Sequence, residues 1–131
     1  MVGEHWKPIT GYEAYYSVSD LGRVFAHPRR VVQSDGSLHW RPGALLTPAP
    51  ANKSGHRSVT LFDAQSRRKK LWLHRLVAQH FIPNPDNLPY VLHGVHGPSD
   101  NRASQLRWGT HSDNEKDKAI HRRLRQEMQG W

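Results

Sequence analysis

The chain has 131 residues, enough for one compact domain or a small domain with an N-terminal extension. It contains no cysteine, which excludes disulfides and thiolate zinc sites, and no run of about 20 apolar residues that could cross a bilayer. Nineteen Lys and Arg against eleven Asp and Glu give a formal net charge of +8. This charge favours a polyanionic partner and salt-sensitive binding; the alternative is a basic protein with no such partner.

The N-terminal part of the chain predicts short strands separated by turns. Residues 12–25 are aromatic and punctuated by glycine, which is typical of small strands. Residues 27–55 are rich in Pro, Gly, Ser and Arg, and we expect loops there around short strands at 31–32 and 44–46. Residues 1–55 therefore form a β-rich N-terminal module in this interpretation.

A basic hairpin is predicted next. Residues 57–63 alternate between apolar and polar side chains, and residues 67–72 return as an antiparallel partner after a short turn. Cations gather at the tip and returning arm of this hairpin: Arg67, Arg68, Lys69 and Lys70. A solvated hairpin end explains them as well as contact with DNA does, and both interpretations stay open.

Residues 73–81 predict a helix. Their apolar residues recur at helical spacing: Leu73, Leu76, Val77 and Phe81. Pro83 ends the helix, because the residue before a proline is pushed out of the helical region. His74 and His80 lie on or beside the apolar face, and we expect both to be structural.

The C-terminal part predicts a strand, a loop, a second strand and a helix, over residues 90–93, 94–105, around 106–108, and from about Asp113 past His121. Thr110 and Ser112 both offer helix N-caps, and Ser112 with Glu115 has the spacing of a capping box. The small antiparallel strands and the strand–strand–helix unit together predict an α+β fold.

This C-terminal unit can carry phosphodiester hydrolysis. The reaction needs an activated water, a cation beside the phosphate and stabilisation of the departing oxygen. Histidine suits the first task, because its ordinary pKa of about 6.5 leaves it able to take a proton near pH 7. His93 ends the first predicted strand and Asn114 lies in the first helical turn, so the hairpin can bring them together.

Three segments of the chain then show a family resemblance. The HNH (ββα-metal, His-Me finger) nuclease motif of phage- and intron-encoded endonucleases resembles the run VLHGVHGPSDNRASQLRWGTHSDNEKDK. The stretch that normally precedes this motif is similar to LHRLVAQHFIPNPDNLPYV. A short module often fused to HNH homing endonucleases, and associated with DNA binding, resembles WKPITGYEAYYSVSDLGRVF.

The resemblance implies an HNH nuclease domain over residues 56–131, with its ββα-metal core at about 90–120, after a DNA-binding module over 1–55. By position, His93 matches the general base that activates water. Gln105 stands where the family usually has an Asn that braces the loop and orients the base. Asn114 matches the final metal ligand.

Two departures from the family pattern bear on the metal. Leu92 occupies the place where many relatives have an Asp ligand, and Gln105 replaces the usual Asn. We expect Mg²⁺, Mn²⁺ or another divalent ion bound by Asn114 and His93, with Asp117, one helical turn on, as a substitute carboxylate. Arg102 and Arg107 are expected to clamp the phosphate.

The resemblance implies a metal-dependent endonuclease or nickase acting on duplex DNA in the cytoplasm of a bacterial host, with the gene carried by a phage. One site per chain favours nicking, by a monomer or a weak dimer, and phage packaging proteins are further candidate partners; no membrane is expected. Eight cations are assigned to DNA contact: Arg67, Arg68, Lys69, Lys70, Arg102, Arg107, Arg122 and Arg123. A catalytically impaired DNA-binding protein that keeps the HNH fold is the alternative, and a zinc domain built on histidines such as His93 and His96 is a third reading.

Overall fold

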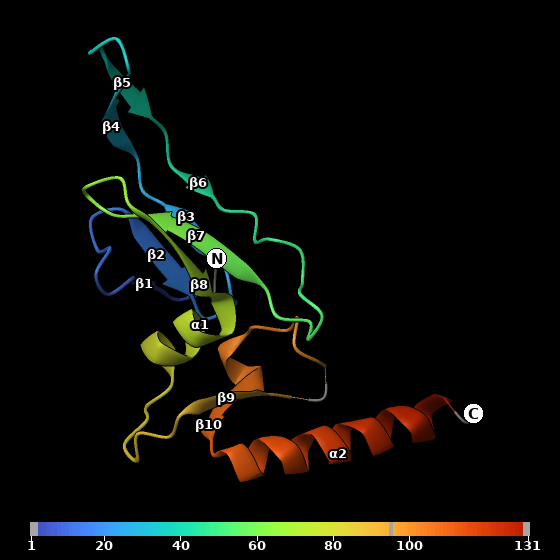
Figure 1. The fold of residues 1–131 in the computed structure, drawn as a ribbon. Coiled ribbons are helices and arrows are strands. Elements are labelled where there is room, and N and C mark those ends of the chain that lie inside the picture. The colour runs from blue at the N-terminus through green and yellow to red at the C-terminus, as the bar shows by residue number, and fades with distance from the viewer. Residues whose placement is uncertain (1–2, 95, 130–131) are drawn as a thin grey trace.

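The computed structural model describes residues 3–94 and 96–129. Its N-terminal part is an antiparallel sheet of four short strands in the order β1-β2-β3-β6. These strands are β1 (Trp6–Pro8), β2 (Tyr16–Ser19), β3 (Val24–Ala26) and β6 (Ala44–Leu45). A separate hairpin, β4 (Arg29–Val32) and β5 (Leu38–Arg41), projects away from the body of the molecule (Figure 1). The sequence did not predict β5, because all four of its side chains are exposed and show no buried face.

The predicted hairpin and helix in the middle of the chain are confirmed. β7 (Ser58–Phe62) pairs with β8 (Arg68–Trp72), and α1 (Leu73–Phe81) follows directly. One hydrophobic cluster joins these elements to the N-terminal sheet and to the second strand of the C-terminal hairpin. Its buried members are Ile9, Tyr16, Val18, Val24, Val59, Leu61, Leu73, Leu76, Val77 and Leu106. The core therefore draws residues from both sides of the boundary that the sequence predicts at position 55.

The C-terminal unit has the predicted order of elements. β9 (Tyr90–His93) pairs antiparallel with β10 (Leu106–Gly109), after the short 3₁₀ helix η1 (Ala103–Gln105), and α2 (His111–Gln129) follows. In Figure 1 this hairpin and α2 lie below α1, which separates them from the β-rich part. Antiparallel strands lie mainly in the N-terminal part and the two helices follow them, which confirms the α+β class.

One detail of α2 corrects the sequence prediction. The helix begins at His111, and its first turn is held by Thr110 and Asp113. The Thr110 hydroxyl accepts a hydrogen bond from the Asp113 amide at 3.1 Å, and the Asp113 carboxylate accepts one from the Thr110 amide at 3.1 Å. The capping box is thus this pair rather than Ser112 and Glu115, because the helix begins at His111, two residues before the predicted start at Asp113.

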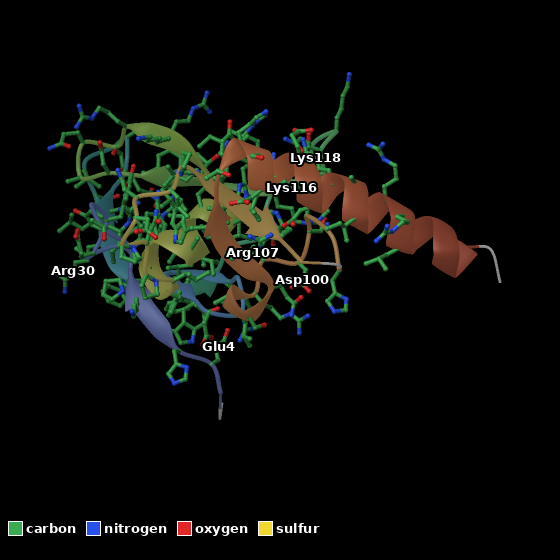
Figure 2. All side chains as sticks on the ribbon, turned by 90° about the horizontal axis from the view of Figure 1, so that it is seen from below. Glu4, Arg30, Asp100, Arg107, Lys116 and Lys118 are labelled. Atoms are coloured by element: carbon green, nitrogen blue, oxygen red, sulfur yellow. The ribbon has the colours of Figure 1, made fainter. Side chains whose placement is uncertain are left out.

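The rest of α2 is polar and extends beyond the other elements (Figure 1). Two of its apolar side chains, Ile120 and Leu124, are exposed. No helix among the described residues is long and apolar enough to cross a membrane. In the view of Figure 2, Lys116 and Lys118 lie along the N-terminal half of α2 with Arg107 close by, whereas Arg30 on β4 lies at the other end of the molecule.

Candidate functional site

The hairpin β9–β10 fixes where His93 and Leu92 point. His93 pairs with Leu106 and Leu92 pairs with Arg107, so the two neighbouring side chains project from opposite faces of the strand. Leu92 is only 2% exposed and is buried beside Gly109. A Cβ atom added at Gly109 would lie 2.5 Å from Leu92 Cδ1, so the leucine fills the space above this glycine. Position 92, where many HNH nucleases have a carboxylate, is therefore occupied in this chain by a buried apolar side chain that packs against Gly109.

His93 is held by a residue in the loop that follows it. Its Nε2 lies 3.2 Å from Oδ1 of Asn101, which is buried. The Asn101 amide nitrogen donates to the carbonyl of Ser99, so the oxygen faces the imidazole as an acceptor. His93 Nε2 must then carry the proton, which leaves Nδ1 with a lone pair. Burial lowers the pKa of His93 below its usual value, although the hydrogen bond to Asn101 acts in the opposite direction.

Two further histidines reach His93 from distant parts of the chain. His56 follows a tight turn in which the side chain of Asn52 accepts hydrogen bonds from the amides of Ser54 and His56. The Ser99 hydroxyl ties this turn to the loop after His93 by donating to the carbonyl of Gly55. The ring centroids of His56 and His93 lie 5.3 Å apart, and the rings are stacked.

His74, in the first turn of α1, completes the group. Its ring centroid lies 4.5 Å from that of His56 and 5.0 Å from that of His93. The side chain is buried, and its Nδ1 has no hydrogen-bond partner among the described residues. Burial lowers the pKa of His74 to about 3, so the ring is neutral at ordinary pH. By contrast, His80 is the expected structural histidine: Nδ1 meets the carbonyl of Leu76 and Nε2 accepts the amide of Thr10.

The three imidazoles lie along a cleft of about 410 Å³, together with side chains from α2. The α2 residues that line it are Asn114, Asp117, Lys118 and Arg122. The structure therefore places His93 and Asn114 in one cleft. A larger hollow of about 520 Å³, between Arg75 and Trp108, is lined by no imidazole and no carboxylate, so the histidine cleft is the better candidate.

The acidic and basic residues predicted near the site are largely paired with one another. Arg107 Nη2 donates to Asp117 Oδ2 at 2.5 Å, which joins β10 to α2. Arg102 donates to both carboxylate oxygens of Asp100, and this ion pair holds the pKa of Asp100 below its usual range. Each of these two guanidinium groups is already paired with a carboxylate. A phosphate would therefore have to compete with that carboxylate for the arginine.

The other predicted residues lie further apart. Gln105 lies against the start of the loop: its backbone carbonyl accepts the Gly94 amide, and its Oε1 would be 2.7 Å from a Cβ at Gly94. At the hairpin tip Arg67 is paired with Asp63, whereas the exposed Arg68, Lys69 and Lys70 form no ion pair within the described part of the chain. Arg122 and Arg123 are exposed on α2. In Figure 1 the β7–β8 turn and α2 lie at different ends of the molecule.

Sequence reasoning missed Asn101, His56 and His74 as parts of the site. His74 was hidden because it interrupts an apolar helical stripe and resembles an ordinary core histidine. His56 stands in a turn with no periodicity. For Asn101 there was a usable signal: it is an amide inside the loop, eight residues from His93, and thus within reach of the strand end.

Comparison with known proteins gives a consistent result. Residues 4–62 match the NUMOD4 motif. The chain is 32% identical over 110 residues to the DNA endonuclease I-HmuI of Bacillus phage SP01, covering 83% of this chain and 54% of that protein. It is 36% identical over 117 residues to an uncharacterized HNH endonuclease of Acanthamoeba polyphaga mimivirus, covering 85% of this chain and 25% of that protein.

A solved structure of I-HmuI, described as showing DNA binding and cleavage by this HNH homing endonuclease, matches the fold with a TM-score of 0.67 and 29% identity. The match covers 88% of this chain and 58% of that chain. The chain thus spans about half the length of I-HmuI and a quarter of the viral relative. The chain is homologous to these HNH endonucleases, and it contains a NUMOD4 motif followed by a strand–strand–helix unit.

Proposed function

We propose that the protein is a metal-dependent DNA endonuclease or nickase in which His93 is the general base. The observation that carries the proposal is the His93 imidazole, hydrogen-bonded to Asn101, in a cleft that Asn114 also lines. Nδ1 takes a proton from water as the water oxygen attacks phosphorus, and the bond from phosphorus to the leaving oxygen breaks. The lowered pKa of His93 keeps this nitrogen unprotonated below neutral pH as well.

The metal is the part of the family mechanism that these residues fit least well. HNH relatives imply Mg²⁺ or Mn²⁺, which would stabilise charge on the phosphate, and Mg²⁺ prefers oxygen ligands. Asn114 is the residue proposed to hold the ion. However, Leu92 has no ligand atom, and the Asp117 carboxylate is engaged by Arg107. A single neutral amide is a poor site for Mg²⁺.

We assign the nearest DNA contacts to α2. Arg122 lines the cleft that contains His93, and Arg123 is exposed beside it. Cations in this position attract the phosphate backbone without reading sequence. The unpaired cations of the β7–β8 hairpin are proposed to touch DNA farther from the scissile bond.

A second candidate function has a specific observation in its favour. The apolar burial of Leu92 and the engagement of Asp117 favour a DNA-binding protein that keeps the fold but cuts poorly. This alternative predicts salt-sensitive DNA binding without metal-dependent cleavage.

Cleavage of supercoiled plasmid distinguishes the two functions. Wild-type protein is incubated with Mg²⁺, with Mn²⁺ and with a chelator, beside His93→Ala and the matched control His39→Ala, whose histidine is exposed on β5. We expect nicked or linear product with either metal and none with chelator. The cleavage rate should fall by about 10²- to 10⁴-fold in His93→Ala and stay unchanged in His39→Ala. Full DNA binding without any product in the folded wild type would establish the alternative.

A further inference from the structure

The histidine cluster has more ligands than the proposed hydrolysis uses. His56, His74 and His93 come from a turn, a helix and a strand end, and one ring nitrogen of each lies within 4.8 Å of the other two. Tetrahedral coordination at a usual metal–nitrogen bond of about 2.0–2.1 Å places ligand nitrogens about 3.4 Å apart. The three nitrogens must therefore come closer together to bind one ion.

Burial favours the neutral form of all three rings. Burial lowers the pKa of His56, of His74 and of His93, so each imidazole is neutral near pH 7 and offers a lone pair. Neutral imidazole is the ligand form of histidine, because a protonated ring has no lone pair to share.

The hydrogen bonds around the rings also favour metal binding. A metal-bound histidine usually donates its second ring N–H to an oxygen, which fixes its orientation. Asn101 Oδ1 provides that acceptor for His93. Within the described part of the chain the buried Nδ1 of His74 has no hydrogen-bond partner, and a buried polar atom left without a partner is destabilising. A cation bonded to this nitrogen would satisfy it.

The chemistry of the ligands selects the ion. Imidazole nitrogens suit zinc, copper, nickel and iron, whereas Mg²⁺ and Ca²⁺ take oxygen. A site with three histidine ligands leaves a fourth position for water or substrate, and this cluster opens into the cleft that Asn114 lines.

We propose that His56, His74 and His93 form a binding site for one transition-metal ion of the zinc class, and that the bound ion competes with the base function of His93. The competition rests on the proposed endonuclease function. It follows because the hydrogen bond from Nε2 to Asn101 leaves one lone pair on His93, at Nδ1. That lone pair cannot hold a metal and accept a proton at the same time.

Binding is tested without any cleavage assay. Zn²⁺ is titrated into the full chain by calorimetry, and Co²⁺ binding is followed by its visible absorption, which reports tetrahedral nitrogen ligation. We expect one ion per wild-type and His39→Ala chain. In His56→Ala the affinity should fall by at least about 100-fold, more than the loss of an outer-shell partner costs. His56→Gln serves as a second variant if circular dichroism shows that the alanine variant is misfolded. Absence of stoichiometric binding, or equal affinity in the folded His56 variants, would overturn the site.

Cleavage then tests the competition separately. We expect equimolar Zn²⁺ to inhibit Mn²⁺-supported cleavage by the wild type. For His56→Ala, inhibition is measured relative to the rate of that variant without Zn²⁺. The same fractional inhibition should then require about 100-fold more Zn²⁺, in line with the weaker Zn²⁺ binding of this variant. Stoichiometric binding with undiminished cleavage overturns the competition but not the site. A wild type that binds Zn²⁺ and never cleaves overturns the endonuclease proposal, and the competition with it.

Discussion

His93 and Asn101, eight residues apart, are joined by a hydrogen bond of 3.2 Å between Nε2 and Oδ1. This contact selects the tautomer of His93 and so decides which nitrogen has the lone pair. The family resemblance assigns the bracing role to Gln105, whereas in the structure the amide that touches the ring belongs to Asn101.

Replacing Asn101 should change the pH dependence of cleavage. In Asn101→Asp a carboxylate faces the ring, and a negative charge raises the pKa of a nearby imidazole. Because the base must be neutral, the acidic limb of the pH–rate profile should move to higher pH by about one unit. Asn101→Ala should lose roughly 10- to 100-fold in rate, as when an outer-shell partner is removed. An Asn101→Asp profile that coincides with the wild type would contradict the positioning role.

Substitutions at position 92 test whether a carboxylate there improves metal-supported cleavage. Leu92→Asp places a charged ligand where many relatives carry one, and we expect faster Mg²⁺-supported cleavage. Leu92→Asn loses the same buried leucine without adding a charge, so it is the matched control. Both variants should be less stable by about 2–5 kcal/mol, because a fully buried leucine is lost. Urea unfolding and plasmid cleavage measure the two effects, and equal rates for the two variants would argue against a metal at this position.

The cations of α2 should control the salt dependence of DNA binding. Each phosphate contact contributes about 0.9 to the slope of log affinity against log salt. Arg122→Ala combined with Arg123→Ala should therefore reduce the slope by up to about 2. Arg67→Ala is the control, because Asp63 already compensates its guanidinium at 2.8 Å. Fluorescence anisotropy at several salt concentrations gives the slopes; a larger change in Arg67→Ala would place the DNA on the hairpin instead.

Acid should destabilise the protein through its buried histidines. The pKa of His74 falls from 6.5 to about 3 on folding, so between these values the unfolded chain binds a proton that the native protein does not. The contribution of His74 to stability is therefore fully present above about pH 6.5 and is lost as the pH falls towards 3, at a slope approaching about 1.4 kcal/mol per pH unit. Urea unfolding between pH 5 and 7.5 measures the slope, which should be smaller in His74→Gln. An unchanged slope in that variant would show that His74 titrates normally.

Much of the local structure followed from the sequence alone. Residues 73–81 formed the predicted helix because their apolar side chains repeat at helical spacing and Pro83 follows. The strand over residues 90–93 and the hairpin before α1 were also predicted, since alternation and turn residues act between near neighbours. The resemblance in turn placed His93 and Asn114 in one unit.

The tertiary structure decided which side chains meet. His56 reaches His93 because the turn before β7 is tied to the loop after β9, a contact between segments that no local pattern connects. The pairing of Asp117 with Arg107, and the burial of Leu92 beside Gly109, likewise depend on how α2 packs on the hairpin. Spacing along a chain fixes periodicity and turns, but distances between separate elements are set by packing of the whole core. For this reason the sequence indicated a histidine-based hydrolytic unit, and only the fold showed that three imidazoles share it.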